Sequence, residues 1–211
     1  MNLIELRADN VSEIARAMVE AARRGDLICF PTDTVYGLGG LAFSERLMEK
    51  LRRVKPERPA KPTAVLIDGM IRMSQCAGDV PSRRIVALSE AFWPGPLTIV
   101  WKTSNAIPKE FQTADRSLGY RVPNSPYLLE AMRTLETPLW ATSANVPGQP
   151  PPRLFTEVKP SILDACDLVI QTREFLSGRA STVVDVRGRE PIVVRESAVR
   201  EDDVLRVWRE A

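Results

Sequence analysis

The alternation of helix-like and strand-like segments most constrains how this chain of 211 residues can fold. Apolar residues recur at helical spacing over 11–24, and short apolar runs such as 63–67 are typical of buried strands. Near the C-terminus, the β-branched runs "STVVDV" and "PIVVR" flank residues 187–190, which predicts a hairpin. Helices that alternate with strands before a hairpin indicate an α/β domain with a mixed, partly antiparallel sheet.

The remaining elements follow from the same periodicities and from helix-capping residues. We expect five helices: over 11–24, from Ser44 to Val54, over 82–92, from Pro126 onward, and over 200–210. Asp9 or Asn10 would cap the first, Ser44 the second and Ser125 the fourth. We expect strands over 27–30, 63–67, 97–101, 117–122 and 138–143. The sequence shows no internal repeat, and the Pro-rich stretch 145–153 is more typical of a wall or lid than of a linker. We therefore expect one domain over residues 1–211.

The chain has no histidine, and this absence excludes several common kinds of active site. Catalysis by Ser-His-Asp or Cys-His groups and metal binding by imidazole are not available to it. Any chemistry must depend on hydroxyls, carboxylates, Lys and Arg side chains and backbone amides. The net charge of +2 is close to neutral, so the overall charge gives no strong indication of a nucleic-acid partner.

The three cysteines are far apart in sequence and form no C-x-x-C pair, which argues against a disulfide framework and a structural zinc site. No apolar run approaches the ~18 residues that a membrane span needs. The N-terminal residues lack the apolar core of a signal peptide. We therefore expect a cytoplasmic protein with reduced cysteines and no membrane partner.

Small polar residues gather where predicted strands end or begin. Thr32-Asp33-Thr34 follows one strand, Thr142-Ser143-Ala144-Asn145 follows another, and Ser181-Thr182 begins a third. In open α/β sheets, ligands lie outside the carboxyl ends of strands, and glycines 37, 39 and 40 would let the backbone approach a ligand closely. Ordinary turn chemistry would explain one such cluster equally well, but two clusters that both follow apolar strands favour a binding site.

A basic stretch, residues 46–61, contains seven Lys or Arg against two Glu. A solvated helix face explains its first four cations, whereas Lys55, Arg58 and Lys61 lie among prolines that hold the chain extended. Cations held in this way lose little entropy when they bind a phosphate or carboxylate. Arg121 and Arg195, each at the end of a predicted strand, are further candidates for an anion site.

Taken in order, these motifs resemble the YrdC/Sua5 family of L-threonylcarbamoyladenylate synthases. The segments that carry the resemblance are "FPTDTVYGLGG", "RPAKP", "WPGPLT", "RVP", "TSANVPGQPP" and "STVVDV…VVR", which run along nearly the whole chain. The resemblance implies a single YrdC-like domain, with a twisted mixed sheet flanked by helices and a positively charged concave cavity.

The resemblance also implies a reaction and a set of site residues. Family members condense L-threonine, bicarbonate and ATP, usually with Mg²⁺, into threonylcarbamoyl-AMP and pyrophosphate. A separate transferase complex then modifies adenosine 37 of tRNAs. By this resemblance the threonine-binding residues are Thr34, Arg121, Ser143 and Ser181, and the ATP-binding residues are Arg58, Lys61, Thr98, Thr142, Asn145 and Arg195. The catalytic residues would be Lys55, Arg58, Ser143 and Asn145, and no protein ligand is assigned to Mg²⁺.

One position departs from the family pattern. The family signature K-x-R…S-x-N is matched by Ser143 and Asn145, but an ungapped alignment places Glu57 where the arginine should be, and Arg58 lies one residue later. Successive side chains of an extended chain point in opposite directions, so this shift bears on nucleotide binding. Two alternatives remain open: a non-catalytic module that binds tRNA or double-stranded RNA, and a paralogue that adenylates another carbamate or carboxylate.

Overall fold

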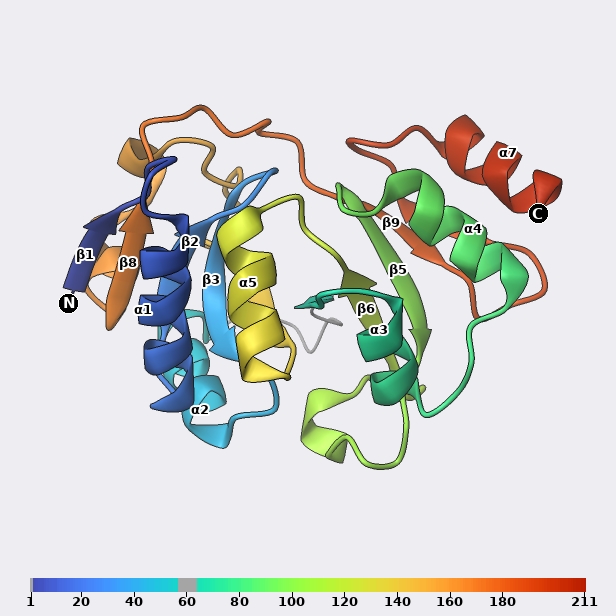
Figure 1. Ribbon diagram of the computed structural model, residues 1–211, viewed down its shortest axis with the longest axis horizontal. Coiled ribbons are helices and arrows are strands. Elements are labelled where there is room, and N and C mark those ends of the chain that lie inside the picture. Colours follow the sequence, from blue (N-terminus) through green and yellow to red (C-terminus); the bar gives the residue numbers. More distant parts are fainter. Residues whose placement is uncertain (1, 57–63) are drawn as a thin grey trace.

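The computed structural model describes residues 2–56 and 64–211. Within these ranges, the strands form one sheet in the order β1-β8-β2-β3-β7-β4-β6-β5-β9-β10 (Figure 1). The strands are β1 (Asn2–Glu5), β2 (Ile28–Pro31), β3 (Tyr36–Leu41), β4 (Ala64–Leu66), β5 (Leu97–Lys102), β6 (Ser117–Arg121), β7 (Leu139–Ser143), β8 (Leu168–Gln171), β9 (Thr182–Asp185) and β10 (Ile192–Arg195). The helices are α1 (Val11–Arg23), α2 (Glu45–Val54), α3 (Met70–Ala77), α4 (Arg83–Phe92), α5 (Pro126–Leu135), α6 (Pro160–Leu163) and α7 (Glu201–Glu210).

The sheet is mixed, as the sequence predicts. Strands β1, β8 and β2 pair in parallel, as do β4 with β6 and β5 with β9. The other neighbouring strands pair antiparallel, and these include the predicted hairpin of β9 and β10. The α/β fold with a mixed sheet flanked by helices is therefore confirmed. The structure contains no helix, in the part of the chain that it describes, that is long and apolar enough to cross a membrane.

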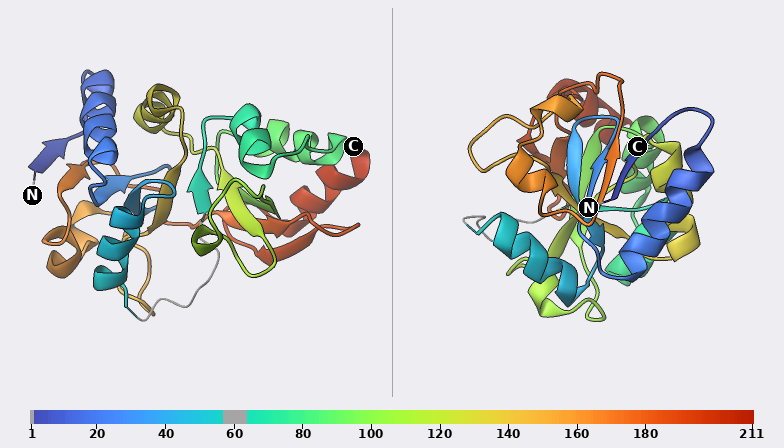
Figure 2. Two further views of the ribbon diagram at one scale, coloured as in Figure 1. Left: turned by 90° about the horizontal axis from the view of Figure 1, so that it is seen from below. Right: turned by 90° about the vertical axis from the view of Figure 1, so that its left-hand side faces the viewer.

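The two faces of the sheet carry different helices. Helices α1 and α5 pack against each other and share a buried cluster with Ile28 and Phe30 of β2 and Leu139 of β7. The alternate residues of the strands belong to a second buried cluster, which includes residues of α2, α3, α4 and α7. Figure 2 shows helices on both sides of the strongly twisted sheet.

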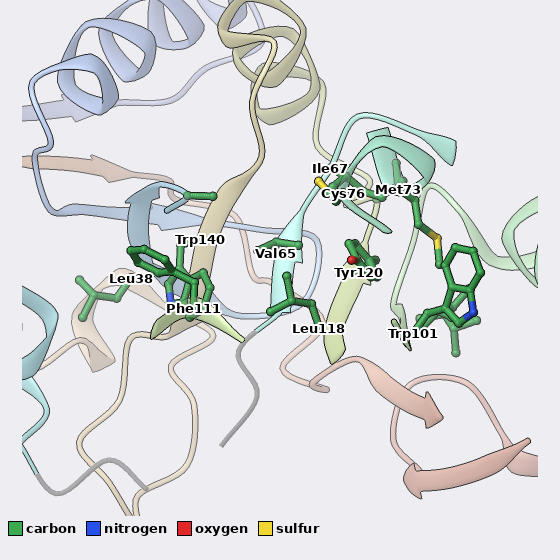
Figure 3. Close-up of a cluster of buried hydrophobic side chains, with 14 of the residues drawn as sticks. Leu38, Val65, Ile67, Met73, Cys76, Trp101, Phe111, Leu118, Tyr120 and Trp140 are labelled. Atoms are coloured by element: carbon green, nitrogen blue, oxygen red, sulfur yellow. The ribbon is translucent and has the colours of Figure 1, made fainter. Parts of the chain in front are cut away.

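Strand β5 shows how this alternation leaves one surface uncovered. Leu97, Ile99 and Trp101 belong to the second buried cluster, whereas Thr98 and Val100 point the other way and line a cavity. In the same cluster, the ring of Phe111 lies 6.1 Å from the ring of Trp140, centroid to centroid (Figure 3). One face of the central strands is therefore core, and the opposite face is available to a ligand.

The capping predictions are met only in part. Ser44 Oγ accepts a hydrogen bond from the Leu47 amide, 3.3 Å away, and so begins α2 as expected. Asn10 occupies the N-cap position of α1 without such a bond, because its side chain instead holds the preceding loop through the Arg7 amide and the Glu5 carbonyl. Ser125 precedes α5 but makes no side-chain capping bond.

The role expected for the glycines was wrong in part. We expected glycines 37, 39 and 40 to let the backbone approach a ligand, but residues 36–41 form the buried strand β3, paired with β2 and β7. A Cβ on Gly39 would lie 1.7 Å from the Trp140 carbonyl oxygen, and a Cβ on Gly40 would lie 2.6 Å from the Asp26 carbonyl oxygen. These two glycines are needed because other backbone approaches closely. Of the three glycines, Gly37 alone is in the cavity lining.

Candidate active site

A cavity of about 640 Å³ lies on the exposed face of the central strands, a volume typical of small-molecule sites. Its floor is built from small residues that are neighbours in the sheet. Ala64 of β4 pairs with Ala141 of β7 on one side and with Gly119 of β6 on the other. Because side chains on one face of a sheet are perpendicular to it, short side chains in one row leave a hollow between taller neighbours.

The structure places most of the predicted site residues around this cavity. The lining includes Thr34, Thr98, Arg121, Thr142, Ser143, Ser181 and Arg195. Lys55 and Asn145 do not line it but contact Ser143. Arg58, Lys61 and Glu57 lie outside the described residues. Segments from Thr34 to Arg195 thus converge on one hollow, whereas the role of each residue stays a prediction.

Arg121 is the most constrained side chain of the site. It is 6% exposed, and three acceptors fix its guanidinium: the Gly95 carbonyl at 3.0 Å, Thr34 Oγ1 at 3.0 Å and Asp33 Oδ1 at 2.6 Å. Burial lowers the pKa of Arg121, and the Asp33 carboxylate opposes that shift. Since a guanidinium has five N–H groups, two remain for a ligand.

Thr34 is oriented in turn by Thr32. Thr32 Oγ1 donates to the Val35 carbonyl at 2.7 Å and accepts from the amides of Thr34 and Val35. The two threonine hydroxyls lie 2.9 Å apart. The polar residues between β2 and β3 therefore form a compact turn that also presents one hydroxyl to Arg121.

A second arginine is held at the same rim by a different set of groups. Arg195 donates through Nε and Nη2 to the Ser181 carbonyl, at 3.1 and 2.8 Å, and Ser181 Oγ lies 2.8 Å from Thr98 Oγ1. Burial lowers the pKa of Arg195. Within the described ranges, no carboxylate forms an ion pair with it, so its positive charge faces the cavity uncompensated by that part of the chain.

The Ser143 region connects three of the predicted residues. Lys55 Nζ donates to the Ser143 carbonyl at 2.5 Å, and Ser143 Oγ donates to Asn145 Oδ1 at 2.5 Å. Asn145 Nδ2 donates to the Gln149 carbonyl at 2.5 Å, which fixes the amide. Since the hydroxyl proton of Ser143 is directed to Asn145, the Ser143 oxygen presents lone pairs to the cavity and can accept a hydrogen bond there.

A charged cluster that the sequence did not identify lies at the other end of the cavity. Arg187 binds Asp185 through Nε at 2.9 Å and Nη2 at 2.6 Å, and its Nη1 also binds Asp115. All three residues line the cavity. The alternation along β9 was the available signal, because Ser181, Val183, Asp185 and Arg187 follow one another at a period of two. The sequence pattern instead places Arg187 in the hairpin turn.

No obvious metal centre accompanies these groups. The structure contains, among residues 2–56 and 64–211, no group of three or more His, Cys, Asp or Glu side chains that could hold a metal ion. The cavity carboxylates Asp115 and Asp185 are engaged by Arg187. These residues do not fit a dedicated magnesium site.

Comparisons with known proteins place the chain in a family. The Sua5/YciO/YrdC family model, described as "Telomere recombination", matches residues 20–197. The threonylcarbamoyl-AMP synthase of Pyrococcus abyssi is 29% identical over 185 residues, which are 88% of this chain and 54% of that protein. The human threonylcarbamoyl-AMP synthase is 30% identical over 182 residues, covering 83% of this chain and 63% of that protein.

Solved structures agree with this assignment. Sua5 of P. abyssi in complex with L-threonine superposes with a TM-score of 0.86 at 28% identity, over 98% of this chain and 60% of that chain. Escherichia coli YciO superposes with a TM-score of 0.83 at 24% identity over 97% of this chain and 98% of that chain, which shows a shared fold. This chain thus spans less than two thirds of the length of the P. abyssi and human relatives. It belongs to the Sua5/YciO/YrdC family.

Proposed function

We propose that this protein is an L-threonylcarbamoyl-AMP synthase, a nucleotidyltransferase that condenses L-threonine, bicarbonate and ATP. The observation that carries the proposal is one cavity with two separately held arginines, Arg121 and Arg195, among hydroxyl groups. Two arginines suit two anionic substrates side by side. The similarity to a threonine-bound relative and to proteins named as this synthase supports the same conclusion.

The reaction needs no enzyme nucleophile, which suits a chain without histidine. The threonine amine adds to the carbon of bicarbonate and water leaves, giving a carbamate. A carbamate oxygen then attacks the α-phosphorus of ATP, and the bond to pyrophosphate breaks. Catalysis of such a displacement consists mainly of positioning and of stabilising the charge on phosphate oxygens.

We assign the binding of threonine and the binding of the nucleotide to different residues. The two free N–H groups of Arg121 would bind the threonine carboxylate, with Thr34, Ser143 and Ser181 completing that site. Arg195, together with Thr98, Thr142 and Asn145, would bind the nucleotide. Lys55 holds the Ser143 carbonyl and so would position the Ser143 hydroxyl between the substrates. Arg58 and Lys61 remain further candidates for the phosphates.

Magnesium would enter bound to ATP. The described residues offer no dedicated cluster of ligands for it, so phosphate oxygens and water would hold most of its coordination positions. In this proposal the product passes to a transferase complex that modifies tRNA. The comparisons support the synthase and not the alternative of a non-catalytic RNA-binding module.

Release of pyrophosphate tests the proposal. Purified protein with ATP, Mg²⁺, bicarbonate and L-threonine should release pyrophosphate at a rate that requires both threonine and bicarbonate, and mass spectrometry should detect threonylcarbamoyl-AMP. L-serine and L-valine serve as controls for the paralogue alternative, because each lacks one feature of the threonine side chain. If L-threonine gives no more pyrophosphate than its omission, this protein is not a synthase.

A further inference from the structure

The cavity has a second end whose chemistry differs from the anion sites just described. Along β9 the lining runs from Ser181, at the anion sites, through Val183 to Asp185 and Arg187 at this end. Val100 of β5 pairs with Asp185, and Val194 of β10 also lines the cavity. Valine side chains therefore accompany Arg187 in the lining, which also includes the polar residues Thr113, Asp115 and Ser117.

Arg187 is poorly suited to bind a phosphate. Two carboxylates, Asp115 and Asp185, surround one guanidinium, so the cluster carries a net charge of −1 when all three groups are ionised. The Thr113 hydroxyl and then the Arg187 guanidinium hold the pKa of Asp115 at about 2, and the Arg187 side chain lowers the pKa of Asp185. All three groups are therefore charged at neutral pH, and a phosphate would meet net repulsion here.

The geometry of Arg187 leaves a different surface for a ligand. Its Nε, Nη1 and Nη2 atoms, which form the edge of the guanidinium, are directed to the two carboxylates. The side chain is still 32% exposed and lines the cavity. What remains for a ligand is one N–H group on each of Nη1 and Nη2, as in Arg121, together with the planar face. Such a face stacks well on aromatic rings.

We propose that the face of the Arg187 guanidinium and the side chain of Val194 receive the nucleobase of ATP at this end of the cavity. Val194 is 63% exposed and lines the cavity, and a flat base would cover it. Arg195 is the next residue, and no carboxylate among residues 2–56 and 64–211 pairs with it, so its charge would lie on the phosphate side of the base. This inference rests on the proposed function for the identity of the nucleotide.

The test separates the base from the phosphates. Calorimetry on the full chain would measure the affinities for ATP and for inorganic triphosphate in the wild type and in Arg187→Ala, Arg187→Lys and Arg189→Ala. Loss of a stacking arginine should weaken ATP binding about two- to thirtyfold, with triphosphate affinity unchanged within a factor of two. Arg187→Lys keeps the charge but has no planar face, so it should resemble Arg187→Ala. Arg189, an exposed arginine of the same hairpin, is the matched control and should leave both affinities unchanged.

Two results would overturn the assignment of the base. One is an ATP affinity unaffected in both Arg187 variants, and the other is an equal loss of affinity for ATP and triphosphate. Circular dichroism checks folding, and Arg187→Lys carries the test if Arg187→Ala does not fold. Threonine-dependent pyrophosphate release is measured on the same preparations. If pyrophosphate is released but ATP affinity does not depend on Arg187, the proposed function stands and the assignment of the base fails. If ATP binds through Arg187 but no pyrophosphate is released, the assignment of the base stands and the proposed function fails.

Discussion

At the scale of single residues, the site depends on polar groups whose hydrogen bonds are already partly committed. Arg121 gives three of its donors to Gly95, Thr34 and Asp33 and keeps two. Ser143 gives its proton to Asn145 and keeps its lone pairs. A side chain fixed by protein partners loses little entropy when it binds a ligand, so these internal bonds prepare the site for its substrates.

Replacing Arg121 by lysine tests whether threonine binding needs a guanidinium that is held by these three protein partners. A lysine ammonium is a point charge without the planar fork of arginine, so it cannot serve Gly95, Thr34 and Asp33 and also bind a carboxylate through two parallel bonds. We expect threonine affinity to fall at least about tenfold, the effect of losing one charge-assisted hydrogen bond. Calorimetry with L-threonine measures it.

The matched control is Arg133→Lys, at an exposed position in the last turn of α5. It should leave threonine affinity unchanged. Urea unfolding of Arg121→Lys should show a loss of about 1–3 kcal/mol, because a buried acceptor is left unpaired. Threonine binding of wild-type strength in Arg121→Lys would remove Arg121 from the carboxylate site.

At the scale of elements, the sequence predicts what local patterns encode and misses what distant pairing creates. The β9–β10 hairpin was predicted because its β-branched runs and its turn are adjacent in sequence. Strand β3 was not predicted, because three of its six residues are glycine, and glycine has no side chain to contribute to a hydrophobic pattern. Pairing with β2 and β7 on both sides makes it a strand. Strands β1 and β8 were also missed, since they pair with each other although they lie more than 150 residues apart in sequence.

Gly39→Ala tests the reason for glycine in β3. The new methyl group would lie 1.7 Å from the Trp140 carbonyl oxygen and 2.8 Å from its carbonyl carbon, so β3 and β7 must separate. Because this clash involves backbone, we expect the free energy of unfolding to fall by at least about 3 kcal/mol. Urea denaturation measures the change.

Gly69→Ala is the control for this substitution. A Cβ at Gly69 meets no heavy atom within 4 Å, and the residue precedes α3 as its N-cap. We expect the free energy of unfolding to fall by about 1 kcal/mol or less, because alanine is a weaker N-cap than glycine. Equal losses in the two variants would mean that the close approach of β7 does not explain the glycine at position 39.

At the scale of the whole molecule, the cavity is assembled from both halves of the sheet. The segment between β8 and β9 crosses from one end of the molecule to the other (Figure 1). On its way, the Gly178 amide donates to the Thr34 carbonyl at 2.9 Å, and the segment then delivers Ser181 to the cavity. The sequence suggested the residues of the site through motifs, but it contained no signal for this crossing. For Arg187 at the far end of the cavity, the alternation along β9 was the signal that the sequence offered.

The ion pair between Arg187 and Asp115 joins segments that are 72 residues apart, so its titration reports on the stability of the whole fold. The pKa of Asp115 lies at about 2 in the folded protein, against about 3.9 for an unperturbed aspartate. A carboxyl whose pKa is depressed by folding contributes stability above its unfolded pKa and loses that contribution as pH falls through its folded pKa. The stabilisation by Asp115 should therefore be complete above about pH 5 and should disappear between about pH 4 and pH 2.

Thermal unfolding at a series of pH values should show Asp115→Asn melting below the wild type at pH 7, with the two melting temperatures converging toward pH 2. Two curves that stay parallel over that range would show that the Asp115 carboxylate does not stabilise the folded protein through its charge.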